Sequence, residues 1–170
     1  MPDIPKTYTA ESYEDALYQR WEESGLFTPI IQEGVRPFVI SIPPPNATGT
    51  LHLGHATMLA IQDIMIRYHR MKGIPSLWIP GTDHAGIATQ NKVEKLLAEK
   101  GITRHQLGRP KFMEEVEKFV EQSRSTIKTQ VKKMGASVDW SRERFTLDQG
   151  LSRAVREVFV RMYSDGIIYR

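Results

Sequence analysis

The sequence predicts an α/β fold, in which short parallel strands alternate with helices, and three observations support this. Two short apolar segments, PFVISIP (37–43) and SLWIP (76–80), carry the β-branched and aromatic residues typical of buried strands. A loop and then a helical pattern follow each of them, over 53–72 and 87–100. Two further helical patterns come later in the chain. The repeated order of strand, loop and helix is typical of βαβ units on a parallel sheet.

A helix is predicted over 12–24, before the first strand. Tyr13, Leu17 and Trp21 recur every four residues and define its apolar face. Ser12 is placed to cap its N-terminus, and Gly25 is placed to end it. We assign 1–36 to an N-terminal helical extension and 37–170 to the main domain.

The helix over 53–72 is apolar nearly all round, so we expect it to be buried on two sides. After Gly101 a long helix is predicted over 109–136, then a loop over 137–148 and a last helix over 149–164. The final residues, GIIYR (166–170), have the composition of a strand. Because natural domains rarely end where a strand begins, we expect a chain that is cut short.

Two loops of this fold carry the residues suited to bind a ligand. In an open parallel sheet, ligands bind beyond the carboxyl ends of the strands. The segments PPPNATGTLHLGHA (43–56) and GTDHAG (81–86) both follow predicted strands, so we expect them to meet in one crevice. The helix that begins near His52 directs its free N–H groups toward this place, which predicts an anion site.

His52 and His55 are three residues apart and share one face of the first helical turn. Each ring can donate an N–H to a phosphate oxygen, and bound negative charge would favour the imidazolium form. Gly54 lets a nucleotide approach the backbone, and Gly49 permits a positive φ. Such a pair is also found on plain helix surfaces or as half of a metal site. Because a metal would need further ligands, we expect no zinc here.

Asp83, in the second loop, could accept from a ribose hydroxyl or bind the ammonium group of a substrate. It could equally cap the following helix, and His84 could lie in the core. A basic cluster, Lys128, Lys132 and Lys133, could contact nucleic acid or be a solvated helix face.

Composition excludes several other classes of protein. The chain has 170 residues, a net charge of +3 and no cysteine, which leaves no disulfide and no cysteine-based zinc site. No apolar run reaches the roughly 20 residues of a membrane span, and the first residues do not form a secretory signal. We therefore expect a cytoplasmic protein without membrane partners.

The motif loops carry a resemblance to a known family. The segment 43–56 resembles the His-x-Gly-His signature region of class I aminoacyl-tRNA synthetases, and PGTDHAGIATQ (80–90) is similar to their second block. Similarity extends through LYQRWEESGLF, LGRPKF and GASVDWSRERFTLD. Within the class, the sequences of these segments are most similar to the valyl-tRNA synthetase family, although Ala47 stands where that family usually has valine.

The resemblance implies the N-terminal half of a Rossmann-like catalytic domain, ending near the insertion of the editing domain. It implies a valine–tRNA ligase of protein biosynthesis, which uses Mg·ATP to form valyl-adenylate and transfers valine to tRNA(Val). His52, His55 and Thr50 would bind the phosphates, with Gly49 and Gly54 at the nucleotide. Pro43, Pro44, Asn46 and Asp83 would bind the amino acid. The whole signature motif would be Pro45, Asn46, Ala47, Thr48, Gly49, Thr50, Leu51, His52, Leu53, Gly54 and His55.

Two alternatives remain. The chain could be an inactive fragment that binds ATP and valine or associates through an exposed sheet edge. It could also be a small nucleotidyltransferase, a class with a related histidine loop on a related fold.

Overall fold

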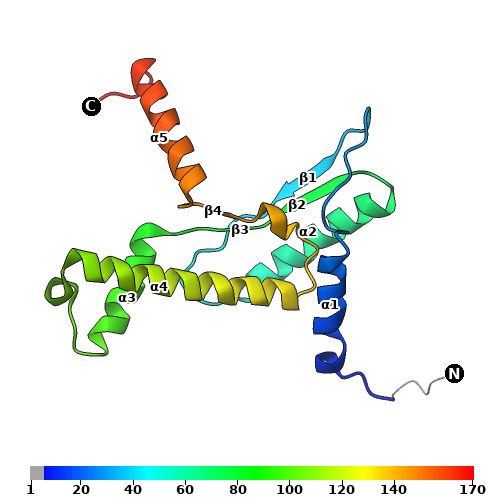
Figure 1. Cartoon of the computed structure of the whole chain (residues 1–170), viewed down its shortest axis with the longest axis horizontal. Helices are drawn as coiled ribbons and strands as arrows, with labels where there is room; N and C mark the ends of the chain where they lie inside the picture. Colours follow the sequence, from blue (N-terminus) through cyan, green and yellow to red (C-terminus); the bar gives the residue numbers. More distant parts are fainter. Residues whose placement is uncertain (1–5) are drawn as a thin grey trace.

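The parallel arrangement of the two predicted strands is confirmed. The structure, a computed structural model, describes residues 6–170 (Figure 1). Strands β1 (Phe38–Ser41) and β2 (Ser76–Ile79) pair in parallel, with Val39 opposite Leu77. Helix α2 (Leu53–Met71) connects them and packs against both, so β1, α2 and β2 form one βαβ unit.

A second parallel pair lies at the carboxyl end of this unit. Strand β3 (Gly81–Thr82) pairs with β4 (Arg144–Phe145), which follows the 3₁₀ helix η2 (Trp140–Arg142). Both β4 and η2 lie within 137–148, where only a loop was predicted, so that prediction was incomplete. A strand of two residues is too short to leave a periodic pattern in the sequence.

Helices α3 (Gly86–Ala98) and α4 (Arg104–Lys133) pack against each other beside the strands (Figure 1). The start of α4 differs from the prediction, because a short segment from Arg104 precedes a break at Gly108, where φ is 73° and ψ is 161°. Pro110 then stands near the start of the long segment, where a proline is tolerated because the first N–H groups of a helix have no partner.

The core gathers side chains from distant segments of the chain. Trp78 of β2 is fully buried, and its Nε1–H donates to Gln62 Oε1 at 3.0 Å. The buried members of this cluster are Ile42, Leu59, Ile66, Trp78, Ile127, Val131, Ala136 and Val138. A second cluster joins α3 to α4 through Val93, Leu97, Phe112 and Val116.

The predicted start of the first helix was wrong. Helix α1 (Glu14–Glu23) begins after a separate 3₁₀ helix, η1 (Ala10–Ser12), so Ser12 is not its cap. Tyr13 holds the N-cap position and makes no side-chain hydrogen bond to the helix backbone. The C-terminus is as predicted, since Gly25 has a φ of 69° just beyond it.

The apolar face of α1 is also one residue away from the prediction. Tyr13 and Leu17 are about half exposed and Trp21 is half-buried, whereas Tyr18 is buried and its hydroxyl donates to Ala136 O at 2.8 Å. This bond ties α1 to the segment that follows α4. Helix α1 is therefore packed on the rest of the chain. Of the extension predicted over 1–36, residues 1–5 lie outside the described part of the chain.

Two predictions of complete burial were wrong. In β1 burial alternates, and Val39 is half exposed. Helix α2 buries Leu59 and Ile66 but exposes Ile61 and Ile64 on its other side. Among residues 6–170 the β1–β2 sheet has only two strands, so it offers too little surface to bury every apolar side chain near it.

Helix α5 (Gln149–Ser164) is as predicted, but no residue in it is buried, and it extends away from the rest of the chain (Figure 1). The expected strand at GIIYR is wrong: Gly166 has a φ of 70°, and Ile167 N–H donates back to Met162 O at 2.9 Å. These residues therefore terminate α5. None of the helices between residues 6 and 170 is both long and apolar enough to cross a bilayer.

Candidate functional site

The two predicted motif loops meet, as expected from their places after β1 and β2. Asn46 and Asp83 form an isolated parallel bridge. Asp83 N–H donates to Pro45 O at 2.8 Å, and Ala47 N–H donates to Asp83 O at 2.7 Å. Because these bonds join backbone to backbone, the two loops form one rigid floor beyond the carboxyl ends of the strands.

The two histidines cap the N-terminus of α2. His52 is the N-cap residue, and its Nδ1 accepts from Gly54 N–H at 3.1 Å. His55 Nδ1 accepts in turn from His52 N–H at 3.2 Å. The ring centroids lie 3.9 Å apart. This is a reciprocal capping box built from two imidazoles, and it satisfies two N–H groups that a helix start leaves free.

This arrangement fixes the tautomer of both rings. A neutral imidazole that accepts at Nδ1 carries its proton on Nε2. Burial, and secondly the neighbouring His52 ring, lower the pKa of His55 below its ordinary value. Protonation would place a hydrogen on Nδ1 against a backbone N–H. At His55 the geometry and the lowered pKa therefore favour a neutral ring that donates through Nε2.

Gly54 has a structural reason to be glycine. A Cβ at this position would lie 2.9 Å from His52 Cε1, closer than side-chain carbons approach, so any side chain would displace the capping ring. Gly49 adopts a φ of 153° with open space around it. The structure places Pro43, Pro44, Asn46, Thr50, His52, Leu53 and Gly54 at the surface, Thr48, Gly49, Leu51 and His55 half-buried, and Pro45 and Ala47 in the interior.

Asp83 is held by two hydrogen bonds. Its Oδ1 accepts from Ala85 N–H at 3.0 Å and from Thr146 Oγ1 at 3.0 Å. The Ala85 N–H is the main cause of a pKa lowered from the ordinary value, so the side chain is a carboxylate at neutral pH. The residue at the N-cap of α3 is Ala85, with a φ of 48°, so Asp83 is not the helix cap considered above.

Thr146 is a site residue that the sequence did not reveal. It follows β4, 63 residues after Asp83, and lies in the stretch GASVDWSRERFTLD, in which no pattern distinguishes it from its neighbours. Its Oγ1 lies 2.9 Å from His84 N and 2.6 Å from His84 Nδ1. The ring of His84 is 39% exposed, so it is not a core histidine.

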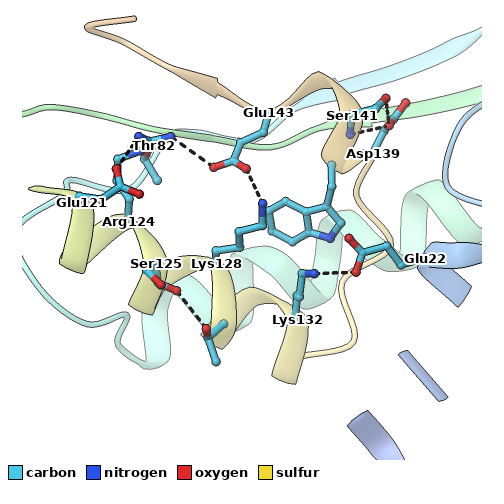
Figure 2. A network of polar contacts seen from close by, with 12 residues as sticks. Glu22, Thr82, Glu121, Arg124, Ser125, Lys128, Lys132, Asp139, Ser141 and Glu143 are labelled. Atoms are coloured by element: carbon cyan, nitrogen blue, oxygen red, sulfur yellow. Dashed lines mark hydrogen bonds and ion pairs between the residues drawn. The ribbon is translucent and has the colours of Figure 1, made fainter. Parts of the chain in front are cut away.

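The basic cluster on α4 is paired inside the chain. Lys128 binds Glu143 at 2.8 Å, Lys132 binds Glu22, and Lys133 binds Asp15 at 2.6 Å (Figure 2 shows the first two). These contacts favour a structural role over contact with nucleic acid.

Trp140 lies beside the same cluster. It packs beneath the Lys128 and Lys132 ammonium groups and donates its Nε1–H to Tyr18 Oη at 2.8 Å. It thereby anchors the loop that follows α4.

A cavity of about 20 Å³, room for one water molecule, lies behind the loops and is lined by Pro45, Thr82, Ile127 and Trp140 among others. His52, His55 and Asp83 do not line this cavity; His52 is exposed, and His55 and Asp83 are half-buried. Within residues 6–170, no three acidic or histidine side chains are grouped so as to hold a metal ion.

Comparison with known proteins agrees with the geometry. The family described as tRNA synthetases class I (I, L, M and V) matches residues 16–170. The chain therefore belongs to this family, which removes the separate small nucleotidyltransferase considered above. Its curated relatives include the chloroplastic/mitochondrial valine–tRNA ligase 2 of Arabidopsis thaliana, 54% identical over 99% of this chain and 17% of the relative.

Bacterial relatives give the same result. The valine–tRNA ligase of Thermotoga maritima is 54% identical over 100% of this chain and 20% of its own length. The valine–tRNA ligase of Pseudothermotoga lettingae is 56% identical over 96% of this chain and 19% of its own length. The chain thus spans about a fifth of the length of these relatives.

A solved structure shares the fold. The leucyl enzyme of Agrobacterium radiobacter K84, crystallised as a ternary complex with tRNA and LeuAMS, matches with a TM-score of 0.78 at 23% identity. The match covers 96% of this chain and 19% of that one. This likeness confirms a partial Rossmann-like α/β fold.

Proposed function

We propose that this chain is the N-terminal part of a valine–tRNA ligase and supplies ATP and valine contacts for the formation of valyl-adenylate. The observation that carries the proposal is the backbone-bonded meeting of the two motif loops. One loop presents two imidazole donors at a helix N-terminus, and the other presents a fixed carboxylate.

The ATP phosphates would bind at the start of α2. The Nε2–H groups of His52 and His55 are the free donors of the two rings, and the N-terminal end of the helix adds a partial positive charge. Thr50 and Gly49 would shape the loop around the phosphates. Gly54, which has no side chain, would let the nucleotide approach the backbone. Mg²⁺ would enter with ATP as part of the substrate.

Valine would bind at the second loop. Asp83 would hold its ammonium group, and the exposed rings of Pro43 and Pro44, with Asn46, would line the pocket. A valine carboxylate oxygen then attacks the α-phosphorus of ATP, the bond to the β-phosphate oxygen breaks, and pyrophosphate leaves. The chain's part in this step is to position the reactants and stabilise charge.

The valyl group would pass from the adenylate to the 3′ end of tRNA(Val), with release of AMP. This second step would use parts of the longer enzyme. We place the reaction in the cytoplasm, where protein biosynthesis consumes its product.

The test is valine-dependent ATP–pyrophosphate exchange by the whole enzyme that carries this chain. The double variant His52→Ala, His55→Ala should lose at least about 100-fold in exchange rate, as expected when oriented donors to a reacting group are removed. His105→Ala, on an exposed turn of α4 away from the site, is the matched control and should keep its rate. Full exchange by the double variant would contradict the proposed role of the histidines.

A second candidate is an association fragment without catalysis. It is supported by the exposed apolar side chains of α2, Ile61, Ile64 and Tyr68, and by the half-exposed Val39 of β1. Sedimentation of the 170-residue chain should then depend on concentration, and Ile64→Lys should restore a monomer. A monomer at all concentrations would exclude this candidate.

A further inference from the structure

We propose that Thr146 is a positioning residue, which orients the Asp83 carboxylate and fixes the tautomer of His84, and so sets the affinity for the amino-acid substrate. The inference rests on the proposed function, in which Asp83 binds the substrate ammonium group. It concerns a residue that lies outside both motif loops.

The Thr146 hydroxyl uses its whole bonding capacity on these two neighbours. A hydroxyl has one proton to donate and two lone pairs that accept. Because Asp83 Oδ1 can only accept, the proton goes to it, at 3.0 Å. The lone pairs then accept from His84 N–H at 2.9 Å and from the ring nitrogen Nδ1 at 2.6 Å. One donation and two acceptances match the three contacts.

This count assigns the proton of His84. If the hydroxyl proton goes to Asp83, then His84 Nδ1 must itself carry a hydrogen in order to donate to Thr146. Its Nε2 is then the unprotonated nitrogen of the neutral ring. His84 thus has the opposite tautomer to His52 and His55.

The same hydroxyl leaves one side of the carboxylate free. Ala85 N–H and Thr146 both bind Oδ1, and Asp83 Oδ2 makes no hydrogen bond to any residue from 6 to 170. Two donors on one oxygen fix the plane of the carboxylate. The other oxygen is then held ready for an ammonium group, with little conformational freedom to lose on binding.

Thr146 is itself firmly held from the backbone. Its N–H donates to Thr82 O at 3.1 Å, and Arg144 N–H donates to Pro80 O at 3.1 Å. Gly81 makes this approach possible, because a Cβ there would lie 3.1 Å from Arg144 O. The short β3–β4 pair therefore fixes Thr146 relative to the second motif loop.

Charged side chains of α4 hold the same segment from the other side. Glu143 lies between Lys128, at 2.8 Å, and Arg124, at 3.6 Å (Figure 2). The Arg124 guanidinium also covers the Phe145 ring at 4.6 Å, and its Nε donates to Thr82 Oγ1 at 3.3 Å. These contacts hold Phe145, the residue before Thr146, and thereby fix the position of the Thr146 hydroxyl.

The experiment compares Thr146→Val with Thr146→Ser in the whole enzyme, by valine-dependent ATP–pyrophosphate exchange. Valine at this position keeps the shape and removes the hydroxyl, so KM for the amino acid should rise at least about tenfold while KM for ATP stays within about twofold. Thr146→Ser should restore the wild-type KM. Thr129→Val, which removes an exposed α4 hydroxyl bonded only to Ser125 O, is the matched control.

A second readout does not depend on activity. The ¹⁵N chemical shifts of the His84 ring should report Nδ1–H in the wild type and in Thr146→Ser, and a shift toward Nε2–H in Thr146→Val. An unchanged KM and unchanged ring shifts in Thr146→Val would overturn the inference, as would equal rises of both KM values together with a lower melting temperature. If the wild type shows no valine-dependent exchange, the proposed function fails, and the ring shifts still decide the role of Thr146.

Discussion

At the scale of single residues, the imidazole capping box is the feature with the clearest chemical meaning. Capping boxes usually pair Ser or Thr with Glu or Gln, whereas here both members are histidines. The backbone orients each ring through Nδ1 and thereby leaves each Nε2–H directed outward. In the proposed function, the donors to phosphate would thus be oriented before a nucleotide binds, which would reduce the entropy lost on binding.

The variant Gly54→Ala tests whether the close packing of the His52 ring on Gly54 stabilises the start of α2. The added Cβ would meet the His52 ring at 2.9 Å, so the ring must leave Gly54 N–H. We expect a loss of about 1 kcal/mol in the free energy of unfolding, the usual cost of a lost N-cap, and a higher KM for ATP. Urea unfolding and exchange kinetics measure the two effects.

Gly86→Ala is the control for this prediction. Gly86 also lies in a first helical turn, but its Cβ would make only ordinary contacts at 3.9 Å. Its stability should be unchanged or higher, because alanine favours the helix. Equal losses in both variants would show that the His52 ring is not the cause.

The lowered pKa of His55 predicts how stability changes with pH. The folded state holds the neutral ring, so the unfolded chain, with its ordinary value of 6.5, takes up the proton first as pH falls. This contribution to stability is complete above that value and is lost as pH falls through the folded pKa. His55→Gln should lose less stability than wild type between about pH 7.5 and pH 5.5, because glutamine can still accept from His52 N–H and does not titrate. Parallel losses measured by urea unfolding would contradict this.

At the scale of elements, α5 differs from the other helices because it lacks tertiary packing. None of its residues is buried, although Asp148 Oδ1 accepts from Leu151 N–H at its start. A 16-residue helix without tertiary contacts is marginal in water. In the 170-residue chain, backbone amides of α5 should therefore exchange with deuterium much faster than those of α4 near Ile127. Equal protection would mean that α5 is covered in solution, for example by a second copy.

Elements with strong periodicity could be predicted, and those that depend on distant partners could not. The sequence located α2, β2, α3 and α5 because their patterns extend over whole helices or apolar segments. It missed β4, which exists only through pairing with β3. It misjudged α1 for a related reason, since Ala136 decides that Tyr18 faces inward.

The candidate site likewise has residues that local sequence patterns predicted and residues whose role depends on distant partners. Local patterns placed His52, His55 and Asp83 on two loops after neighbouring strands, and topology brings those loops together. The direction of the imidazole protons needs atomic distances, and so does the role of Thr146, whose partners are 62 and 63 residues away. The binding roles of these residues stay predictions until the exchange assays are made.

At the scale of the whole molecule, one core joins the strands to helices α2 and α4 and to the segment that follows α4. Trp78 lies at its centre, fully buried. Trp78→Ala should lower the free energy of unfolding by about 3–5 kcal/mol, a large part of the roughly 5–15 kcal/mol of a typical domain. Urea unfolding of the 170-residue chain measures this loss.

Trp78→Phe provides the comparison. It keeps most of the volume and removes the donor to Gln62 Oε1 together with part of the ring system, so it should lose clearly less stability than the alanine variant. If both variants unfold at the wild-type urea concentration, the central cluster does not hold the chain together.

The backbone bonds that join the first loop to Asp83 have a consequence for how this region can vary. A substitution in either loop, other than proline at Asp83 or Ala47, leaves the bonds of Asp83 N–H to Pro45 O and of Ala47 N–H to Asp83 O in place, because they use main-chain atoms only. An added or deleted residue would instead put a different main-chain group opposite each partner. The two loops can therefore change their side chains independently, but their lengths are bound to each other.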